Sequence, residues 1–212
     1  FTIGNDVRPV PRNSVELLDG LRAALAAVPR PSPDIAQVPL AGGLVGYSSY
    51  DIVRYFERLP TIAQPLPHAP PLLHYSAPES LLVFDHLTRG IALLHAGSDA
   101  DRAALRRAVI GALRGPAPAS LGSIGHHTPP VASVSREQYL AGVRRTQEYI
   151  AAGDVYQLVL SSRFSGRHDH DPFQVYRALR LINPSPYMFY CRFGELTVVG
   201  SSPEALVKLN KG

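Results

Sequence analysis

Prolines and glycines divide this chain into short segments, and this limits the length of every helix and strand that it can form. Its 212 residues include 20 prolines and 17 glycines. Three prolines between residues 29 and 33 end a helical pattern that begins near residue 14. Residues 60–71 are too rich in proline for a helix or a central strand. Residues 115–130 are rich in Gly, Pro, Ala and Ser without an apolar period, so we predict a linker and a domain boundary there.

Four helices are predicted from apolar residues that recur at helical spacing. They cover about residues 14–28, 99–114, 136–152 and 172–182. Each follows a side chain that can accept a hydrogen bond from the first helical turn, namely Asn13, Ser98, Ser135 and Asp171. Asn13 with Glu16, and Ser135 with Gln138, also have the spacing of a reciprocal capping box.

Short apolar runs predict the strands, at residues 41–47, 81–85, 91–95, 155–161, 188–193, 196–199 and 205–209. The runs 188–193 and 196–199 flank Gly194-Glu195 and are predicted to form a hairpin. Because helices and strands do not alternate regularly, the order favours an α+β fold over a doubly wound parallel sheet.

Composition excludes several classes of protein. The chain is 45% hydrophobic and 18% charged, which is ordinary for a globular protein, and no apolar run approaches the length of a membrane helix. The first residues do not resemble a signal peptide. A single cysteine, Cys191, excludes an internal disulfide and fits a cytoplasmic protein. The net charge of +4 comes from scattered arginines, so we expect no nucleic-acid partner and no membrane partner.

Histidine and glycine clusters carry little chemistry when their spacing is considered alone. His168 and His170 are only two residues apart, and Asp171 is better placed to cap a helix, so we interpret this segment as a solvated loop. His126-His127 lies in the predicted linker. Residues 42–46 do not fit a phosphate loop, because no Lys-Ser/Thr pair and no helix follow. Close backbone approach within a sheet is the better use of these glycines.

Two C-terminal segments leave alternatives open. In residues 183–190, two prolines stiffen a turn that three aromatic residues and Met188 follow. Such a surface can hold a flat aromatic ligand, or it can be the entry to a core strand. In residues 200–204, Glu204 follows a glycine- and proline-containing break, where a carboxylate can serve as a general acid or base or simply lie in a surface turn.

Three segments taken together resemble the large subunit of anthranilate synthase, within the chorismate-utilising enzymes. They are residues 42–60, residues 150–161 with the string Gly153-Asp154-Val155-Tyr156-Gln157, and residues 176–204. The resemblance implies an α+β fold in which antiparallel sheets form a sandwich flanked by helices, incomplete in this chain. Residues 1–130 would form the N-terminal region and residues 131–212 the first part of the chorismate-binding domain.

The resemblance also assigns roles to residues. Gln157 stands where related enzymes carry a lysine that activates water, and an amide cannot act as a base at neutral pH, so ammonia is the expected nucleophile. Glu204 matches a glutamate near the chorismate ring and is a catalytic candidate. Pro186, Tyr187 and Met188 match residues that contact the inhibitor L-tryptophan, and we add Asn183 and Ser185 to this tryptophan-binding segment.

The implied reaction converts chorismate and ammonia to anthranilate and pyruvate, with Mg²⁺ as cofactor and a glutamine amidotransferase subunit as the source of ammonia. The metal ligands are expected outside this chain, which we therefore expect to be inactive by itself. Two other functions remain open: the large subunit of aminodeoxychorismate synthase, and a non-catalytic tryptophan-binding module.

Overall fold

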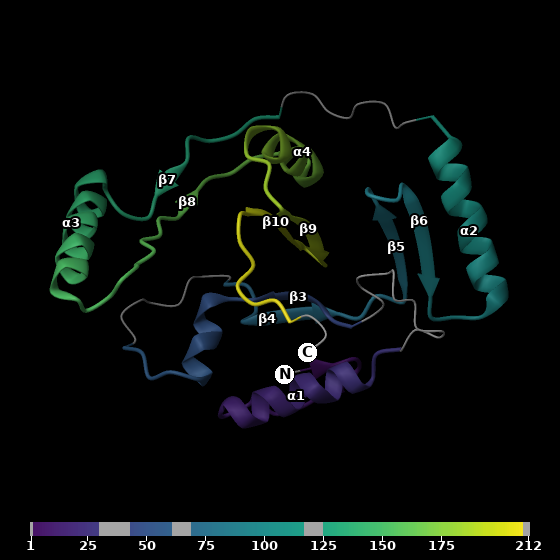
Figure 1. Ribbon diagram of the computed structural model, residues 1–212, viewed down its shortest axis with the longest axis horizontal. Coiled ribbons are helices and arrows are strands. Elements are labelled where there is room, and N and C mark those ends of the chain that lie inside the picture. Colours follow the sequence, from purple (N-terminus) through teal and green to yellow (C-terminus); the bar gives the residue numbers. More distant parts are fainter. Residues whose placement is uncertain (1, 30–42, 61–68, 117–124, 210–212) are drawn as a thin grey trace. The chain divides into compact units, whose positions relative to one another are not determined.

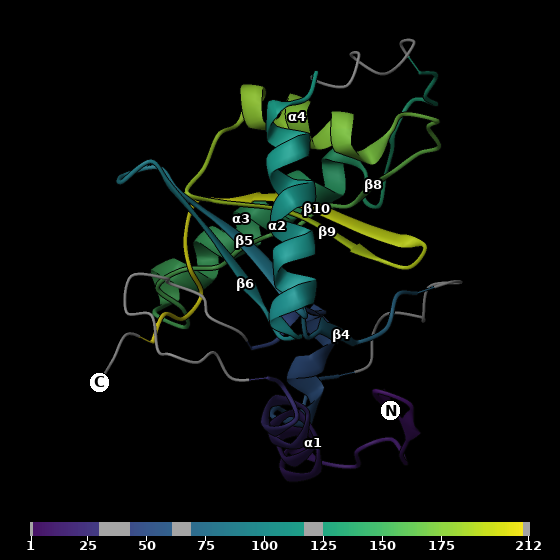
Figure 2. The same cartoon turned by 90° about the vertical axis from the view of Figure 1, so that its right-hand side faces the viewer.

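The computed structural model describes residues 2–29, 43–60, 69–116 and 125–209. Its contacts divide the chain into two units, shown as one ribbon in two orientations in Figures 1 and 2. The first unit comprises residues 1–117 and 193–196, and the second comprises residues 118–192 and 197–212. The regions expected from family resemblance, 1–130 and 131–212, stay a prediction.

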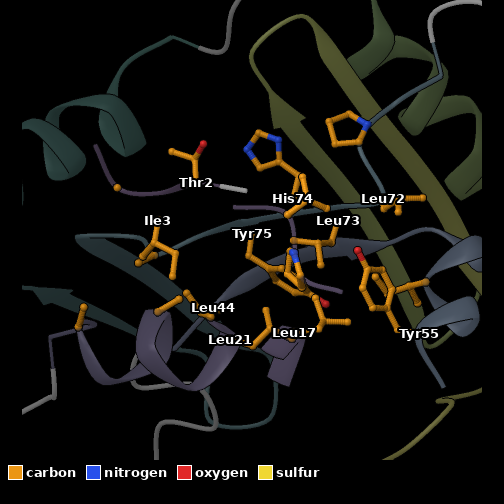
Figure 3. Close-up of a pocket in the computed structure, with 18 of the residues that line it drawn as sticks. Thr2, Ile3, Leu17, Leu21, Leu44, Tyr55, Leu72, Leu73, His74 and Tyr75 are labelled. Carbon is orange, nitrogen blue, oxygen red and sulfur yellow. The ribbon is translucent and has the colours of Figure 1, made fainter. Parts of the chain in front are cut away.

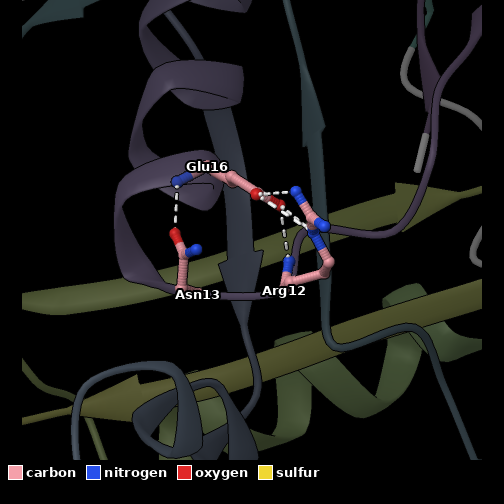
Figure 4. A network of polar contacts seen from close by, with 3 residues as sticks. All are labelled: Arg12, Asn13 and Glu16. Carbon is pink, nitrogen blue, oxygen red and sulfur yellow. Dashed lines mark hydrogen bonds and ion pairs between the residues drawn. The ribbon is translucent and has the colours of Figure 1, made fainter.

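The first unit begins with a short pair of strands, β1 (Thr2–Ile3) and β2 (Asp6–Val7), followed by helix α1 (Ser14–Ala26). Asn13 caps α1 as predicted, because its Oδ1 accepts a hydrogen bond of 2.9 Å from the Glu16 amide. The reciprocal half of the capping box is shifted by one residue. The Glu16 carboxylate accepts from the amide of Arg12 at 2.8 Å and from its guanidinium at 2.7 Å (Figure 4). The hydrogen bond from the Arg12 side chain is the largest cause of the lowered pKa of Glu16.

Strands β3 (Val45–Ser48) and β4 (Leu73–Ser76) pair antiparallel, and a 3-10 helix, η1 (Tyr50–Tyr55), follows β3. Gly46 lies opposite Tyr75, and a Cβ atom at Gly46 would collide with the carbonyl of His74 and with Tyr75. The expected close backbone approach is therefore confirmed at Gly46. Strand β4 was not predicted, because the four residues Leu-His-Tyr-Ser, which come shortly after the proline-rich residues 60–71, show no clear alternation of apolar and polar side chains.

The strands predicted at residues 81–85 and 91–95 are confirmed as β5 (Ser80–Asp85) and β6 (Gly90–His95), which pair antiparallel as a hairpin. Asp85 holds its turn, since its carboxylate accepts from the Leu87 amide at 2.9 Å and from the Thr88 hydroxyl at 2.6 Å. Helix α2 (Asp99–Arg114) lies alongside β6 (Figures 1 and 2). Gly115 ends α2 in an extended conformation, with φ of −73°, so it does not form the left-handed cap that its position suggests.

The second unit contains helix α3 (Arg136–Ala152), with the boundaries that the sequence predicted. Both bonds of the Ser135–Gln138 capping box are present, and Gly153 closes the helix in a left-handed conformation with φ of +81°. Strands β7 (Val131–Ala132) and β8 (Phe164–Ser165) form a short antiparallel pair.

Two strand predictions in this unit are wrong. Residues 155–161 form no strand, although their composition favours one, because no described segment pairs with them. Residues 205–209 likewise have no partner, whereas residues 200–202, expected to break the hairpin, continue its second strand. A strand requires a hydrogen-bonded neighbour that local sequence does not reveal.

Helix α4 (Pro172–Ile182) and the hairpin of β9 (Tyr187–Phe193) and β10 (Leu196–Ser202) complete the fold. Asp171 caps α4 as predicted, since its carboxylate accepts from the Phe173 amide at 2.8 Å. Gly194 makes the hairpin turn with φ of +61°. The tip of this hairpin belongs to the first unit, where the Phe193 ring lies 5.5 Å from that of Tyr47 and 4.6 Å from that of His74.

The α+β class is confirmed, with each described sheet made of two strands. This fits the expectation of an incomplete set of antiparallel sheets. Very little of the described chain is buried: Leu17 is 2% exposed and Val28 is 8% exposed, and no other described hydrophobic side chain reaches that degree of burial. Among the described helices, none combines the length and the apolar character needed to span a lipid bilayer.

Because packing is sparse, we predict that side-chain caps control the stability of individual helices. Ser135→Ala removes one capping bond and should destabilise the start of α3 by about 1 kcal/mol. Amide hydrogen exchange in the first turns of α3 should then become about fivefold faster, measured by mass spectrometry.

Ser98→Ala is the matched control, because Ser98 caps α2 in the same way, accepting from the Asp101 amide at 3.1 Å. It should accelerate exchange in α2 and leave α3 unchanged. Equal acceleration of both helices by either variant would contradict local control.

Candidate functional site

The candidate tryptophan segment lies between α4 and β9 and is held by aromatic packing. On α4, Phe173 and Tyr176 lie with ring centroids 5.9 Å apart. The Tyr190 ring of β9 packs against both, at 5.4 Å from Phe173 in an edge-on arrangement and at 6.0 Å from Tyr176. These contacts set the direction of the loop 183–186, since both of its ends leave elements that the three rings join.

A hydrogen bond joins this loop to the end of β10. The hydroxyl of Ser201 donates to the backbone carbonyl of Asn183 at 2.6 Å. Asn183 is the C-terminal cap of α4, and the last carbonyls of a helix lack partners within the helix. Ser201 thus satisfies one of these carbonyls and brings together two of the segments that the sequence analysis singled out.

Close packing joins the same two segments at a second point. The Phe189 ring lies so near Gly200 that a Cβ atom at this glycine would overlap the ring. Residue 200 must therefore be glycine for the ring to keep its position. The sequence indicated a break here, but the glycine serves the packing of a continuous strand.

The catalytic candidate Glu204 follows directly after β10. Its backbone carbonyl accepts a hydrogen bond of 2.9 Å from the Ser202 hydroxyl, which holds the turn through Pro203. The Glu204 side chain itself is exposed. The adjacent serines of β10 therefore bond to different partners, Ser201 to the loop before β9 and Ser202 to the backbone of Glu204.

Ser185 is the most informative residue of the tryptophan segment. Its hydroxyl is buried and has no hydrogen-bond partner among the described residues. A buried hydroxyl without a partner is unfavourable, and it marks a place where a partner from outside the described chain would be stabilised. Around it, Pro186 is exposed, Tyr187 is 43% exposed and Met188 is half-buried.

Gln157 lies in the unpaired stretch between α3 and β8, with its side chain exposed. No hydrogen bond between Gln157 and Glu204 is present among the described residues. The stretch is anchored at Leu160, whose side chain lies against the backbone of α3 at Gly142. The described contacts therefore join residues 183–190 to residues 200–204, and among the described residues no hydrogen bond links Gln157 to either segment.

The first unit contains a hollow of about 940 Å³ that the sequence analysis missed (Figure 3). Leu17 and Leu21 of α1, Leu73 and Tyr75 of β4, and Tyr55 of η1 contribute to its lining. None of its described lining residues is Asp, Glu, Lys or Arg, and His74 is the one ionisable imidazole among them, so the lining is mainly apolar. The apolar stripe that predicts the first helix also supplies Leu17 and Leu21 to this lining, but helical spacing alone does not show that the stripe faces a hollow.

The histidines are more ordered than the sequence suggested. His127, expected in a linker, and His168, expected in a solvated loop, pair through an antiparallel β-bridge. The rings of His168 and His170 lie 5.6 Å apart. Even so, no group of three or more His, Cys, Asp or Glu side chains within the described ranges is arranged to hold a metal ion.

The chain is similar in sequence and in structure to known proteins. The chain is 42% identical to anthranilate synthase component 1 of Thermus thermophilus over 98% of its own length and 46% of that relative. It is 33% identical to the protein of the same name from Acetivibrio thermocellus, over 97% of the chain and 44% of the relative. The crystal structure of anthranilate synthase component I from Streptococcus pneumoniae superposes with a TM-score of 0.69 at 30% identity, covering 91% of this chain and 45% of that one.

The chain thus spans a little under half the length of each of these relatives. A family model described as chorismate binding enzyme matches residues 5–212. Because this match includes nearly every residue, the chain belongs to the family of chorismate binding enzymes.

Proposed function

We propose that this chain is part of the chorismate-using subunit of an anthranilate synthase. The observation that carries the proposal is the 42% identity to anthranilate synthase component 1 of Thermus thermophilus, which extends over 98% of the chain. The proposed reaction adds ammonia at C2 of chorismate with loss of the C4 hydroxyl as water, then eliminates pyruvate to give anthranilate. The cell compartment proposed for it is the cytoplasm.

Two residues are assigned to this chemistry. Glu204 would donate a proton to the leaving hydroxyl, and the hydrogen bond from Ser202 to its backbone supports a fixed position for it. Gln157 would exclude water as the nucleophile, because an amide side chain does not bind a proton at neutral pH and cannot activate water. Ammonia, supplied by a glutamine amidotransferase subunit, would then react without competition from hydroxide.

The cofactor proposed for this reaction is Mg²⁺, which would hold the substrate carboxylate and supply positive charge near it. Magnesium is commonly held by one or two carboxylates, by several waters and by the substrate itself. We assign its protein ligands to the part of the relatives that this chain does not match.

L-Tryptophan is the proposed inhibitor, bound by Asn183, Ser185, Pro186, Tyr187 and Met188. The unpartnered hydroxyl of Ser185 supports a polar ligand at this place. The partly exposed Tyr187 ring and the Met188 thioether provide surfaces on which an indole ring packs favourably.

The exposed apolar surface supports the proposal that activity needs more polypeptide than this chain. Apolar side chains in residues 155–161 lie on the surface: Tyr156 is 94% exposed and Val159 is 82% exposed. A run of exposed apolar side chains favours packing against a further partner.

The first test uses the complete reading frame that contains this chain, assayed with chorismate, Mg²⁺ and ammonium by anthranilate fluorescence. We expect anthranilate to form, and its rate to fall as tryptophan is added. Consumption of chorismate without anthranilate would instead identify an aminodeoxychorismate synthase and contradict the proposal.

The second test concerns the 212-residue chain by itself, which should form no anthranilate under the same conditions. Addition of a separately produced polypeptide that corresponds to the unmatched half of the relatives should restore activity and protect residues 155–161 from hydrogen exchange. Activity of the chain without this addition would contradict the assignment of magnesium ligands.

The third test replaces Ser185 by alanine in the complete protein. Since the hydroxyl has no described partner, its removal should leave the thermal unfolding midpoint unchanged or slightly raised. If the hydroxyl bonds to the inhibitor, the Kd for tryptophan measured by calorimetry should rise about tenfold.

Ser133→Ala serves as the control, because the Ser133 hydroxyl is already used in accepting from the Arg163 amide at 3.1 Å. It should lower the unfolding midpoint without changing the Kd. If the Kd for tryptophan is unchanged in Ser185→Ala, the proposal that Ser185 binds tryptophan is wrong.

A further inference from the structure

The end of β10 carries two adjacent serines whose hydroxyls bond in different directions. Ser201 donates to the carbonyl of Asn183 at 2.6 Å, and Ser202 donates to the carbonyl of Glu204 at 2.9 Å. Neighbouring side chains on a strand point to opposite faces, so this strand end can hold one partner on each side. One partner lies in the proposed tryptophan segment and the other is the proposed proton donor.

The first of these bonds is strongly constrained. Asn183 ends α4, its own amide donates to the Leu179 carbonyl at 2.8 Å, and its carbonyl is taken by Ser201. A ligand that moves the loop after Asn183 must therefore either carry Ser201 with it or break this bond. Breaking it would leave a helix-end carbonyl without its partner.

The strand end also resists sliding along its neighbour. The Phe189 ring lies directly against Gly200, so a shift of β10 relative to β9 would drive the ring into the flanking backbone. Because β10 cannot slide along β9, a displacement of Ser201 also displaces the backbone of the residues that follow it, Ser202 and Glu204. Pro203 stiffens the intervening turn, and the Ser202 bond ties it to Glu204.

We propose that Ser201 is a positioning residue that couples occupancy of the segment Asn183–Met188 to the position of Glu204. The proposal rests on the proposed function, because it takes tryptophan as the ligand of that segment. Tryptophan weakens the use of chorismate, in this scheme, by displacing Asn183 and, through the Ser201 hydroxyl, the backbone that presents Glu204. The hydrogen bond from the Ser201 hydroxyl to the Asn183 carbonyl then links the binding of tryptophan to the binding of chorismate.

The test compares Ser201→Thr with Ser201→Val in the complete protein. These side chains have nearly the same shape, both suit a strand, and only threonine keeps the hydroxyl. For each variant, the Kd for tryptophan is measured by calorimetry without chorismate. The coupling is measured as the ratio of the KM for chorismate at saturating tryptophan to the KM without tryptophan.

We expect Ser201→Thr to keep the wild-type ratio and Ser201→Val to lower it about tenfold or more, with the Kd for tryptophan within about threefold of wild type in both. Equal ratios in the two variants would overturn the proposal. So would a large loss of tryptophan affinity confined to Ser201→Val, because Ser201 would then belong to the binding site itself.

The wild-type protein separates this proposal from the proposed function. If the wild type makes anthranilate but tryptophan leaves its KM unchanged, the tryptophan assignment fails, and the coupling fails with it. If tryptophan inhibits the wild type and both variants equally, only the role of Ser201 fails.

Discussion

Shortage of apolar burial is the constraint on which the rest of this structure depends. Leu17 and Val28 are the most buried hydrophobic residues of the described chain, and its helices and hairpins are held mainly by bonds to near neighbours in sequence. Asn13, Ser98, Ser135 and Asp171 cap the four helices, and Asp85 holds a hairpin turn. Local hydrogen bonds fix conformation well, but each adds only about 1 kcal/mol of net stability. Apolar faces remain available for further packing.

The contrast between local hydrogen bonds and long-range packing explains which elements could be predicted from the sequence. All four helices and the hairpins β5–β6 and β9–β10 follow from caps, turn residues and periodicity, which act within a few residues. The strands expected at 155–161 and 205–209 are absent from the described structure because a strand needs a partner distant in sequence. Strand β4 was missed for the converse reason, since its pairing with β3 outweighs a weak local preference.

The candidate site also depends on interactions between segments that are distant in sequence. Residue type and resemblance single out Asn183, Ser185, Tyr187 and Glu204 as candidates one by one, but they do not predict the hydrogen bonds and packing that join their segments. The Ser201 hydroxyl and the packing of Phe189 on Gly200 join two segments only after the hairpin has formed. The buried, unpartnered hydroxyl of Ser185 is likewise a property of the fold, because serine is equally common in surface turns. The assignment of Gln157 rests on resemblance alone, because no hydrogen bond among the described residues links it to the other candidates.

The two-residue turn between β9 and β10 has a consequence for how this part of the chain can change during evolution. Gly194 makes the turn, and the strand that follows carries Ser201 and Ser202 towards different partners. Inserting or deleting one residue in β10 before Ser201 would turn each subsequent side chain to the other face of the hairpin. The serines would then exchange directions, and Gly200 would leave its place beneath Phe189. Substitutions at exposed hairpin positions such as Glu195 are therefore tolerated far more readily than any change in strand length.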